Sequence, residues 1–192
     1  MIIGIVPKVI EKYKNQFEYS VELKLINFLK KCFKKSEVYV LNEKQKVNLD
    51  LLIFSGGNDI YQLSKKKKDN IREKIDAYYF KNQKGKVPII GICYGAQFLA
   101  KKFIKKFKKS NKHVRSHNLY FSSLINKKKI KVFSHHNYVI DDLRKLKIFA
   151  RADDGTIEGF YKFKTFFGII WHPERQNKID TQIKIFKKIY ET

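Results

Sequence analysis

Short apolar runs alternate with longer amphipathic stretches along the first half of the chain. The apolar runs are short enough for strands buried on both faces, and they lie near 2–6, 37–41, 50–55 and 87–92. The stretches with helical spacing predict helices near 16–34, near 66–82 and from just after 92 to about 107. In the first of these, Phe17, Val21 and Leu25 recur four residues apart. Strands that alternate with helices predict a parallel sheet.

From about residue 117 the pattern changes to shorter alternating segments, which are typical of strands. These segments lie near 118–124, 129–133, 147–152, 156–163 and 166–171, and a helix near 178–191 follows them. The sequence shows no internal repeat and no linker rich in proline or serine. We therefore expect residues 1–192 to form a single α/β domain: a three-layer sandwich with a central, mostly parallel sheet and a short-strand C-terminal portion.

A cysteine lies where the fourth apolar run meets the following helical stretch. Cys93 is flanked by Gly91 and Gly95, and strand, Gly-x-Cys-x-Gly and helix together are the thiol form of a nucleophile elbow. The glycines permit a tight, strained turn, and a helix N-terminus favours the thiolate. Cys93 is therefore predicted as a nucleophile, although a lone cysteine is more often a small buried hydrophobe.

A second motif, His172-Pro173-Glu174, follows the last apolar run. Proline disfavours helical geometry at the preceding residue, and residues two apart in an extended segment face the same way. Glu174 is therefore expected to reach the imidazole of His172 and to orient it as the base of a nucleophile–base–orienter set. Without the cysteine motif, the same residues would indicate only a surface turn.

Two glycines end the third apolar run. Gly56 and Gly57 precede Asn58 and allow the backbone to approach a substrate closely. The backbone amide of Gly57, with that of Tyr94 after the cysteine, is predicted to form an oxyanion hole. An ordinary strand-terminating turn fits these residues as well.

The order and content of these motifs resemble the class I glutamine amidotransferase superfamily. The matching segments are SGGND at 55–59, GICYGAQ at 91–97 and WHPE at 171–174. The SGGND form is similar to the γ-glutamyl hydrolases of the C26 peptidase type, and residues 134–137 and 153–160 also fit that group. The WHPER sequence at 171–175 further resembles a narrower group, the γ-glutamyl-CDP-amidate hydrolases of bacterial capsule phosphoramidate synthesis.

This resemblance implies a flavodoxin-like fold and the hydrolysis of a γ-glutamyl amide. It implies that a γ-glutamyl thioester forms on Cys93 and that glutamate and an amine are released, with no metal or organic cofactor. The leaving amine carries phosphate or a nucleotide if the narrower resemblance holds. The candidates for substrate contact are Gly56, Asn58, Gln97, Arg115 and His136.

Two other functional classes remain open. The same chemistry would serve a glutaminase subunit that delivers ammonia to a synthetase partner. A catalytically inactive binding protein is disfavoured because all three triad residues are present.

The charge is strongly positive. Lys and Arg number 42 against 18 acidic residues, the net charge is +24, and only five of the cations are arginine. The lysine clusters lie at 65–68, 105–109 and 127–129. The composition of an AT-rich genome and electrostatic steering of an anionic substrate both explain this excess. Nucleic-acid binding is disfavoured because arginine is scarce and no nucleic-acid-binding motif is present.

Two further histidines are four residues apart. His113 and His117 have a spacing that can bind a metal, but no cysteine or acid completes the set and Asn118 is a poor ligand. No metal site is therefore predicted, and a plain surface loop is expected here. Contact of Arg115 or a histidine with substrate is the alternative.

The remaining features bear on the compartment. No apolar run approaches the roughly 18 residues of a membrane span, and residues 1–6 lack the basic start of a signal peptide. The two cysteines provide no disulfide framework, and Cys32 is expected to pack within a helix. A reducing cytoplasm suits a catalytic thiolate, so a cytoplasmic location is predicted.

Overall fold

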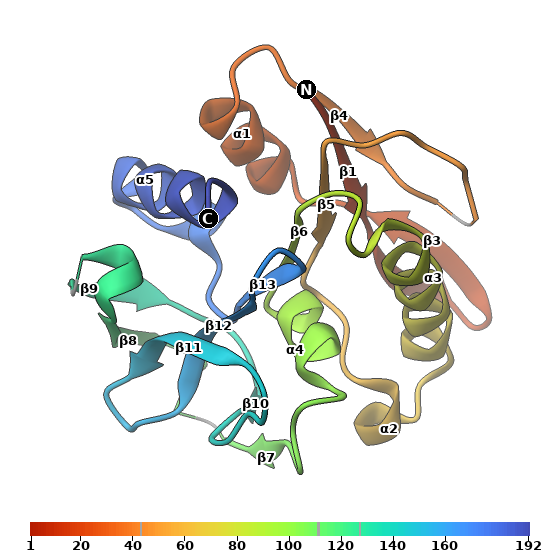
Figure 1. The fold of residues 1–192 in the computed structure, drawn as a ribbon. Coiled ribbons are helices and arrows are strands. Elements are labelled where there is room, and N and C mark those ends of the chain that lie inside the picture. Colours follow the sequence, from red (N-terminus) through yellow and green to blue (C-terminus); the bar gives the residue numbers. More distant parts are fainter. Residues whose placement is uncertain (43, 111, 127) are drawn as a thin grey trace.

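A nine-stranded sheet forms the centre of the computed structural model, which describes residues 1–42, 44–110, 112–126 and 128–192 (Figure 1). The five parallel strands are, in spatial order, β4 (Glu37–Val40), β1 (Ile2–Val6), β5 (Leu51–Phe54), β6 (Ile89–Ile92) and β13 (Phe166–Ile169). Antiparallel strands continue the sheet, and they are β12 (Ile157–Lys162), β11 (Lys147–Ala152), β8 (Ser116–Phe121) and β9 (Lys129–Phe133). The sheet is therefore mixed, with the predicted parallel core and the predicted short strands joined edge to edge.

Helices cover both faces of the parallel core, which gives the predicted three layers (Figure 1). On one face lie α1 (Leu23–Cys32) and α5 (Ile179–Tyr190), and on the other lie α3 (Lys67–Gln83) and α4 (Tyr94–Ala100). Successive strand residues serve opposite faces, so Ile53 packs in the cluster under α1 while Phe54 packs in the cluster under α3. Among the described residues, no helix is long and apolar enough to cross a membrane.

The prediction of a helix over 16–34 is wrong in its first part. Residues 16–20 form β3 (Gln16–Ser20), which pairs with β2 (Lys8–Tyr13) in an antiparallel hairpin. Asn15 takes a φ of 62° at the turn, and its N–H donates to the Glu11 carboxylate. Tertiary pairing thus overrides the helical spacing of Phe17 and Val21, and the helix begins only at Leu23.

The helix that follows Cys93 is also shorter than predicted. It ends at Ala100 rather than near 107, because the chain turns there and Phe103 N–H donates to the Ala100 carbonyl. The turn places the Phe103 ring 6.0 Å from that of Phe166. The hydrophobic pattern does not predict the short elements α2 (Tyr61–Ser64), β7 (Lys108–Lys109), β10 (Tyr138–Val139), η1 (Ser123–Ile125) and η2 (Pro173–Arg175).

Candidate active site

Cys93 lies in a strained turn between β6 and α4. Its backbone has φ 53° and ψ −109°, a combination that costs a non-glycine residue on the order of 1–3 kcal/mol. Two hydrogen bonds stabilise the turn: Cys93 N–H donates to the Ile169 carbonyl at 2.8 Å, and Gln97 N–H donates to the Cys93 carbonyl at 3.0 Å. Backbone strain that the surrounding structure maintains in this way is typical of a functional position.

The glycines on either side of Cys93 are required by close backbone contacts. A Cβ atom at Gly91 would lie 2.5 Å from the carbonyl carbon of Gly95. A Cβ atom at Gly95 would lie 2.1 Å from the carbonyl oxygen of Phe54. Because backbone atoms cannot move aside cheaply, each position excludes any side chain, which is the physical reason for the Gly-x-Cys-x-Gly pattern.

The pair formed by His172 and Glu174 lies just beyond β13. The Nδ1 atom of His172 is 2.6 Å from Oε1 of Glu174, and both side chains are buried. His172 has the extended backbone that Pro173 predicts, but the residues after it form the 3₁₀ turn η2 rather than continuing extended. The expected contact between His172 and Glu174 is therefore present, although it is made across a turn.

The surroundings of His172 favour its protonated form. Burial acts to lower the pKa of its imidazole, but the neighbouring Cys93 sulfur and the Glu174 carboxylate outweigh burial and raise that pKa to about 10. A protonated imidazole beside a sulfur nucleophile can give its proton to a leaving group and take one back during acyl transfer.

Cys93 and His172 line the same small cleft. The cleft has a volume of about 210 Å³, and Gly57, Gln97 and Arg175 contribute to its walls. Gly56 lies against both side chains, since a Cβ atom there would be 2.9 Å from Cε1 of His172 and 3.1 Å from Cβ of Cys93. The absence of a side chain at Gly56 therefore leaves the room in which imidazole and thiol face each other.

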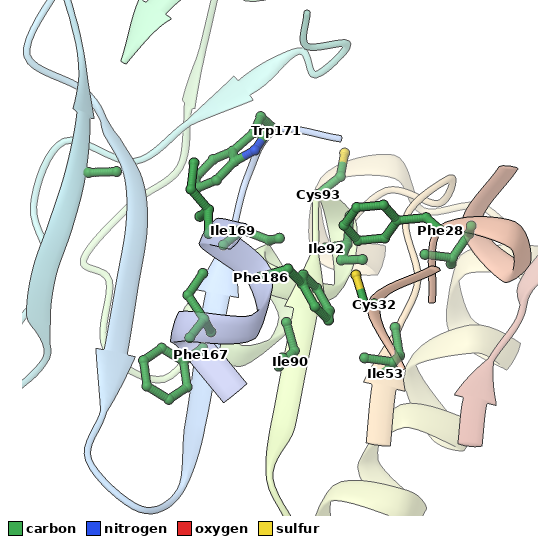
Figure 2. Packing of buried hydrophobic residues seen from close by; sticks show 14 of the residues in the cluster. Phe28, Cys32, Ile53, Ile90, Ile92, Cys93, Phe167, Ile169, Trp171 and Phe186 are labelled. Atoms are coloured by element: carbon green, nitrogen blue, oxygen red, sulfur yellow. The ribbon is translucent and has the colours of Figure 1, made fainter. Parts of the chain in front are cut away.

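Cys32 has a different environment, as Figure 2 shows. Both cysteines are buried in the same apolar cluster, but Cys32 lies on α1 among Phe28, Phe186 and Ile53. Cys93 lies beyond Ile92 at the end of β6, where it also lines the cleft (Figure 2). Burial raises the pKa of the Cys32 thiol to about 12, so this thiol stays protonated. The expected packing role of Cys32 agrees with this position.

The two backbone amides predicted to form an oxyanion hole lie on either side of the nucleophile turn. Tyr94 is the first residue of α4, where backbone N–H groups have no acceptor within the helix. Gly57 takes a φ of +97° in the cleft wall, a conformation that favours glycine. Its Cα lies against Lys8, whose Cδ would be 2.7 Å from a Cβ atom at this position.

The structure distributes the other candidate residues between the cleft, the scaffold and the surface. Asn58 and Gln97 line the cleft, but their side-chain amides bond to protein: Asn58 to Val9 and Asp69, and Gln97 to the Tyr138 carbonyl. Arg115 is exposed and is not among the described residues that line the cleft.

Other cleft residues were not found from the sequence. Arg175 lines the cleft and forms ion pairs with Glu22 and, at 3.7 Å, with Glu174. The carbonyl oxygen of His135 lies 3.9 Å from the Cys93 sulfur and accepts from it. The position of Arg175 directly after the His-Pro-Glu motif was the available signal, whereas no sequence signal marks a backbone carbonyl.

The expectation of a plain surface loop at His113 and His117 is wrong. Both side chains are buried, and they surround the fully buried carboxylate of Glu158 on β12 together with His136. His136 also lines the cleft, and its Nδ1 is 3.0 Å from the Tyr138 carbonyl. Burial opposes ionisation of Glu158, but the three surrounding imidazoles keep the pKa of its carboxyl below the usual range. The acid that the sequence analysis missed is therefore supplied by a distant strand.

A larger hollow of about 860 Å³ lies elsewhere, between α3 and α4. Phe80, Phe98 and Phe103 line it together with several lysines, but none of the three triad candidates does. Nearer the reactive residues, Lys66 and Lys68 lie close enough to Asp59 in the cleft wall to act on its carboxylate. Burial and the neighbouring Asp69 raise the pKa of the Asp59 carboxyl above its usual value, and the two lysines act against this rise.

Comparison with known proteins shows the family of this chain. The family described as "Glutamine amidotransferase class-I" matches residues 13–192, so the chain belongs to this family of amide-hydrolysing enzymes. It is 35% identical to the "Gamma-glutamyl-CDP-amidate hydrolase" of Campylobacter jejuni over 143 residues, which are 71% of this chain and 68% of that protein.

Two further similarities are to a protein sequence and to a solved structure. The chain is 29% identical over 142 residues to the "GMP synthase [glutamine-hydrolyzing]" of Ruthia magnifica, a match that covers 68% of this chain and 26% of the relative. The crystal structure of a protein from Thermoplasma acidophilum, described as one component of a GMP synthase, superposes with a TM-score of 0.72. That match covers 98% of this chain and 92% of the other at 19% identity, so it shows the shared fold alone.

Proposed function

We propose that this protein is a γ-glutamyl hydrolase in which Cys93 is the nucleophile, His172 carries the proton and Glu174 orients the imidazole. The observation that carries the proposal is that Cys93 lines one small cleft together with His172, whose Nδ1 is bonded to Glu174. The raised pKa of His172 supports it, because a charged imidazole can donate to a leaving amine.

In the first half-reaction the Cys93 sulfur attacks the γ-carbonyl carbon of the substrate. Negative charge develops on the carbonyl oxygen, where the amides of Gly57 and Tyr94 are the proposed donors. The tetrahedral intermediate collapses as the C–N bond breaks and His172 gives its proton to the departing amine. A γ-glutamyl thioester on Cys93 remains, and the imidazole is left neutral.

In the second half-reaction a water molecule attacks the thioester carbonyl. Neutral His172 takes a proton from this water, the C–S bond breaks, and glutamate leaves the cleft. The sulfur departs as thiolate, and the imidazole is again protonated. Glu174 bonds to Nδ1 throughout, which directs Nε2 towards the reacting atoms.

For the substrate, we propose a leaving amine that carries phosphate, with a cytidine-diphosphate amidate as the specific candidate. The identity to the Campylobacter hydrolase supports this choice. The net charge of +24, with Lys66 and Lys68 close enough to act electrostatically on the cleft residue Asp59, provides a field that attracts an anion.

The second candidate is a glutaminase subunit that passes ammonia to a synthetase partner. The matches to GMP synthase proteins favour it, since they share this fold and, in one case, 29% identity over 68% of the chain. The reacting residues would be the same, but the substrate would be free glutamine.

One panel of assays separates these candidates. Purified protein is given glutamine, a neutral γ-glutamyl amide or a γ-glutamyl nucleotide amidate, each at low and high ionic strength. We expect the amidate to have the highest kcat/KM and to lose most of it as salt rises, because salt screens the steering charges. If glutamine is the best substrate, or if activity requires a synthetase, the second candidate replaces the first. If the neutral amide is best and salt changes nothing, the lysines do not act in catalysis.

A further inference from the structure

A second cluster of buried titratable side chains lies beside the cleft, separate from the pair at His172. Its members are His113, His117, His136 and Glu158. The exposed fractions of these residues are 2%, 9%, 4% and 0%, so the cluster is closed to bulk water. Buried polar groups normally have hydrogen-bond partners. In this cluster, ring nitrogens of all three histidines and both carboxylate oxygens of Glu158 have none among the described residues.

The two ring nitrogens of His113 have different neighbours: Nε2 contacts Asp154, outside the cluster, and Nδ1 faces Glu158, within it. Its Nε2 is 2.9 Å from Oδ2 of Asp154, where an N–H donates to the carboxylate. In the neutral ring, Nδ1 then carries a lone pair directed at Oε1 of Glu158, 3.1 Å away, and this nitrogen has no hydrogen-bond partner among the described residues. A histidine whose outer N–H is bonded to a carboxylate is the usual arrangement of a metal ligand with its outer partner.

His136 repeats this arrangement with a backbone partner. Its Nδ1 is 3.0 Å from the Tyr138 carbonyl, which can only accept, so Nδ1 carries the hydrogen. Its Nε2 then presents a second lone pair to the same Oε1 of Glu158 at 3.2 Å. Two imidazole lone pairs and a carboxylate oxygen repel one another unless a cation lies among them.

His117 provides a third nitrogen. Within the described residues neither of its ring nitrogens has a hydrogen-bond partner, and its Nε2 is 3.7 Å from Oε2 of Glu158. One atom each from His113, His117 and Glu158 lie within 4.8 Å of one another. Ligand atoms around a tetrahedral zinc ion with bonds of about 2.0–2.1 Å are roughly 3.4 Å apart, and the carboxylate–imidazole separations of 3.1, 3.2 and 3.7 Å are close to that value.

We infer that His113, His117 and Glu158 bind a divalent transition-metal ion of the zinc class, with His136 as the nearest candidate for the fourth ligand. One such ion satisfies all the inward-facing lone pairs. Without an ion, His113 and His136 would both have to be protonated to donate to the same Oε1 of Glu158, with their ring centroids 5.0 Å apart in a buried site. Imidazole and carboxylate are ligands that suit zinc.

The site would strengthen a wall of the cleft. The His136 side chain belongs to the cluster and also lines the cleft, and the backbone N–H of His136 donates to the backbone carbonyl of His113. Glu158 lies on β12, where its carbonyl accepts from Ile170 N–H, two residues before His172. An ion there would tie the loop of residues 134–137 to the strand that leads towards His172.

Metal binding is tested without reference to activity, so its failure would leave the proposed hydrolase untouched. Tag-free Cys93→Ala protein is used, because this change removes the thiol as a competing ligand. After chelator treatment it is titrated with Zn²⁺ by calorimetry and with Co²⁺ by visible absorption. We expect one ion per chain, a four-coordinate cobalt spectrum without a thiolate charge-transfer band, and a Tm that rises with Zn²⁺ concentration.

Variants in the same background locate the site. Glu158→Gln should weaken Zn²⁺ binding by about 100-fold or more, and Asp154→Asn, which keeps every ligand, by on the order of 10- to 100-fold. Asp153→Asn is the matched control, since Asp153 bonds only to Asn118 among the described contacts, and its affinity should equal that of the parent. The inference is overturned if the parent binds no stoichiometric ion, or if Glu158→Gln and Asp154→Asn both bind as the parent does.

Discussion

Two buried histidine–glutamate contacts lie close together in this protein, and they differ in what the other ring nitrogen meets. In the pair His172–Glu174, one nitrogen bonds to the carboxylate and the other faces the cleft beside Cys93. In the cluster at Glu158, His113 has a carboxylate on each side, and three imidazoles converge on one acid.

The difference shows that a contact between histidine and carboxylate does not by itself define a function. A single acid on one side leaves a ring free to move a proton to and from a substrate. Acids on both sides fix the ring, and converging rings create a place for a cation. The proposed proton carrier and the proposed metal ligands are thus distinguished by their second nitrogen.

The strongest way to break this comparison is to remove the sulfur that His172 faces. Cys93→Ala should abolish turnover, because no other cysteine is among the described residues that line the cleft and could form the thioester. Circular dichroism should remain that of the wild type. Cys32→Ala is the matched control and should keep nearly full kcat, since Cys32 lies in the apolar cluster away from the cleft. Substantial turnover by Cys93→Ala would contradict the assignment.

The carboxylate of the pair can be neutralised with little change in shape. Glu174→Gln should lower kcat by on the order of 10²- to 10⁴-fold, because the imidazolium loses its counter-charge and its fixed tautomer. Glu37→Gln is the matched control at an exposed carboxylate on β4 and should retain wild-type kinetics. If Glu174→Gln were as active as the wild type, another group would have to orient His172.

A smaller change tests the space between the two reacting side chains. In Gly56→Ala the new methyl group would lie 2.9 Å from Cε1 of His172, so the ring must shift. We expect kcat to fall roughly 10²-fold, the typical cost of a small misplacement, while the unfolding midpoint in urea changes little. Gly85→Ala, where a Cβ atom meets nothing within 4 Å, should keep the activity and lose only about 1 kcal/mol to its φ of +77°. Unchanged kinetics in Gly56→Ala would show that the gap is not needed.

The smallest effect concerns pH. Because the folded-state pKa of His172 is raised to about 10, its contribution to stability is complete below the unfolded value of about 6.5 and is lost as the pH rises through 10. NMR titration of the ring should show a lower pKa in Cys93→Ala, since the sulfur is one of the groups that raise it. The unfolding free energy of that variant should also fall less steeply between pH 7 and 10. An unchanged pKa would mean that the two groups do not interact.

Much of the parallel core was predictable, because its strands are continuous apolar runs that few other structures accommodate. The buried runs Leu51–Phe54 and Ile89–Ile92 are examples. The strand Gln16–Ser20 was not predictable, because its apolar residues also fit helical spacing. Only its pairing with β2 makes this segment a strand rather than the start of a helix. The end of α4 depends likewise on a distant ring, that of Phe166.

The candidate site divides in the same way. Cys93 and the His172–Glu174 contact follow from local motifs, because a strained turn needs its glycines and the carboxylate is two residues from the ring. The cluster at Glu158 could not be predicted, because its acid lies more than 40 residues from His113 in the sequence. Only the sheet, in which β11 lies between β8 and β12, brings the two segments together. In the sequence, the members of this cluster are separate residues that form no recognisable metal-binding motif.

Covalent labelling tests the central claim, that Cys93 is the nucleophile of a γ-glutamyl hydrolase, most directly. Wild-type protein, Cys93→Ala and Cys32→Ala are each treated with an electrophilic glutamine analogue and analysed by intact-protein mass spectrometry and peptide mapping. We predict one label per chain on Cys93 in wild type and Cys32→Ala, and none in Cys93→Ala. Labelling at Cys32, or equal labelling of the Cys93→Ala protein, would contradict the account.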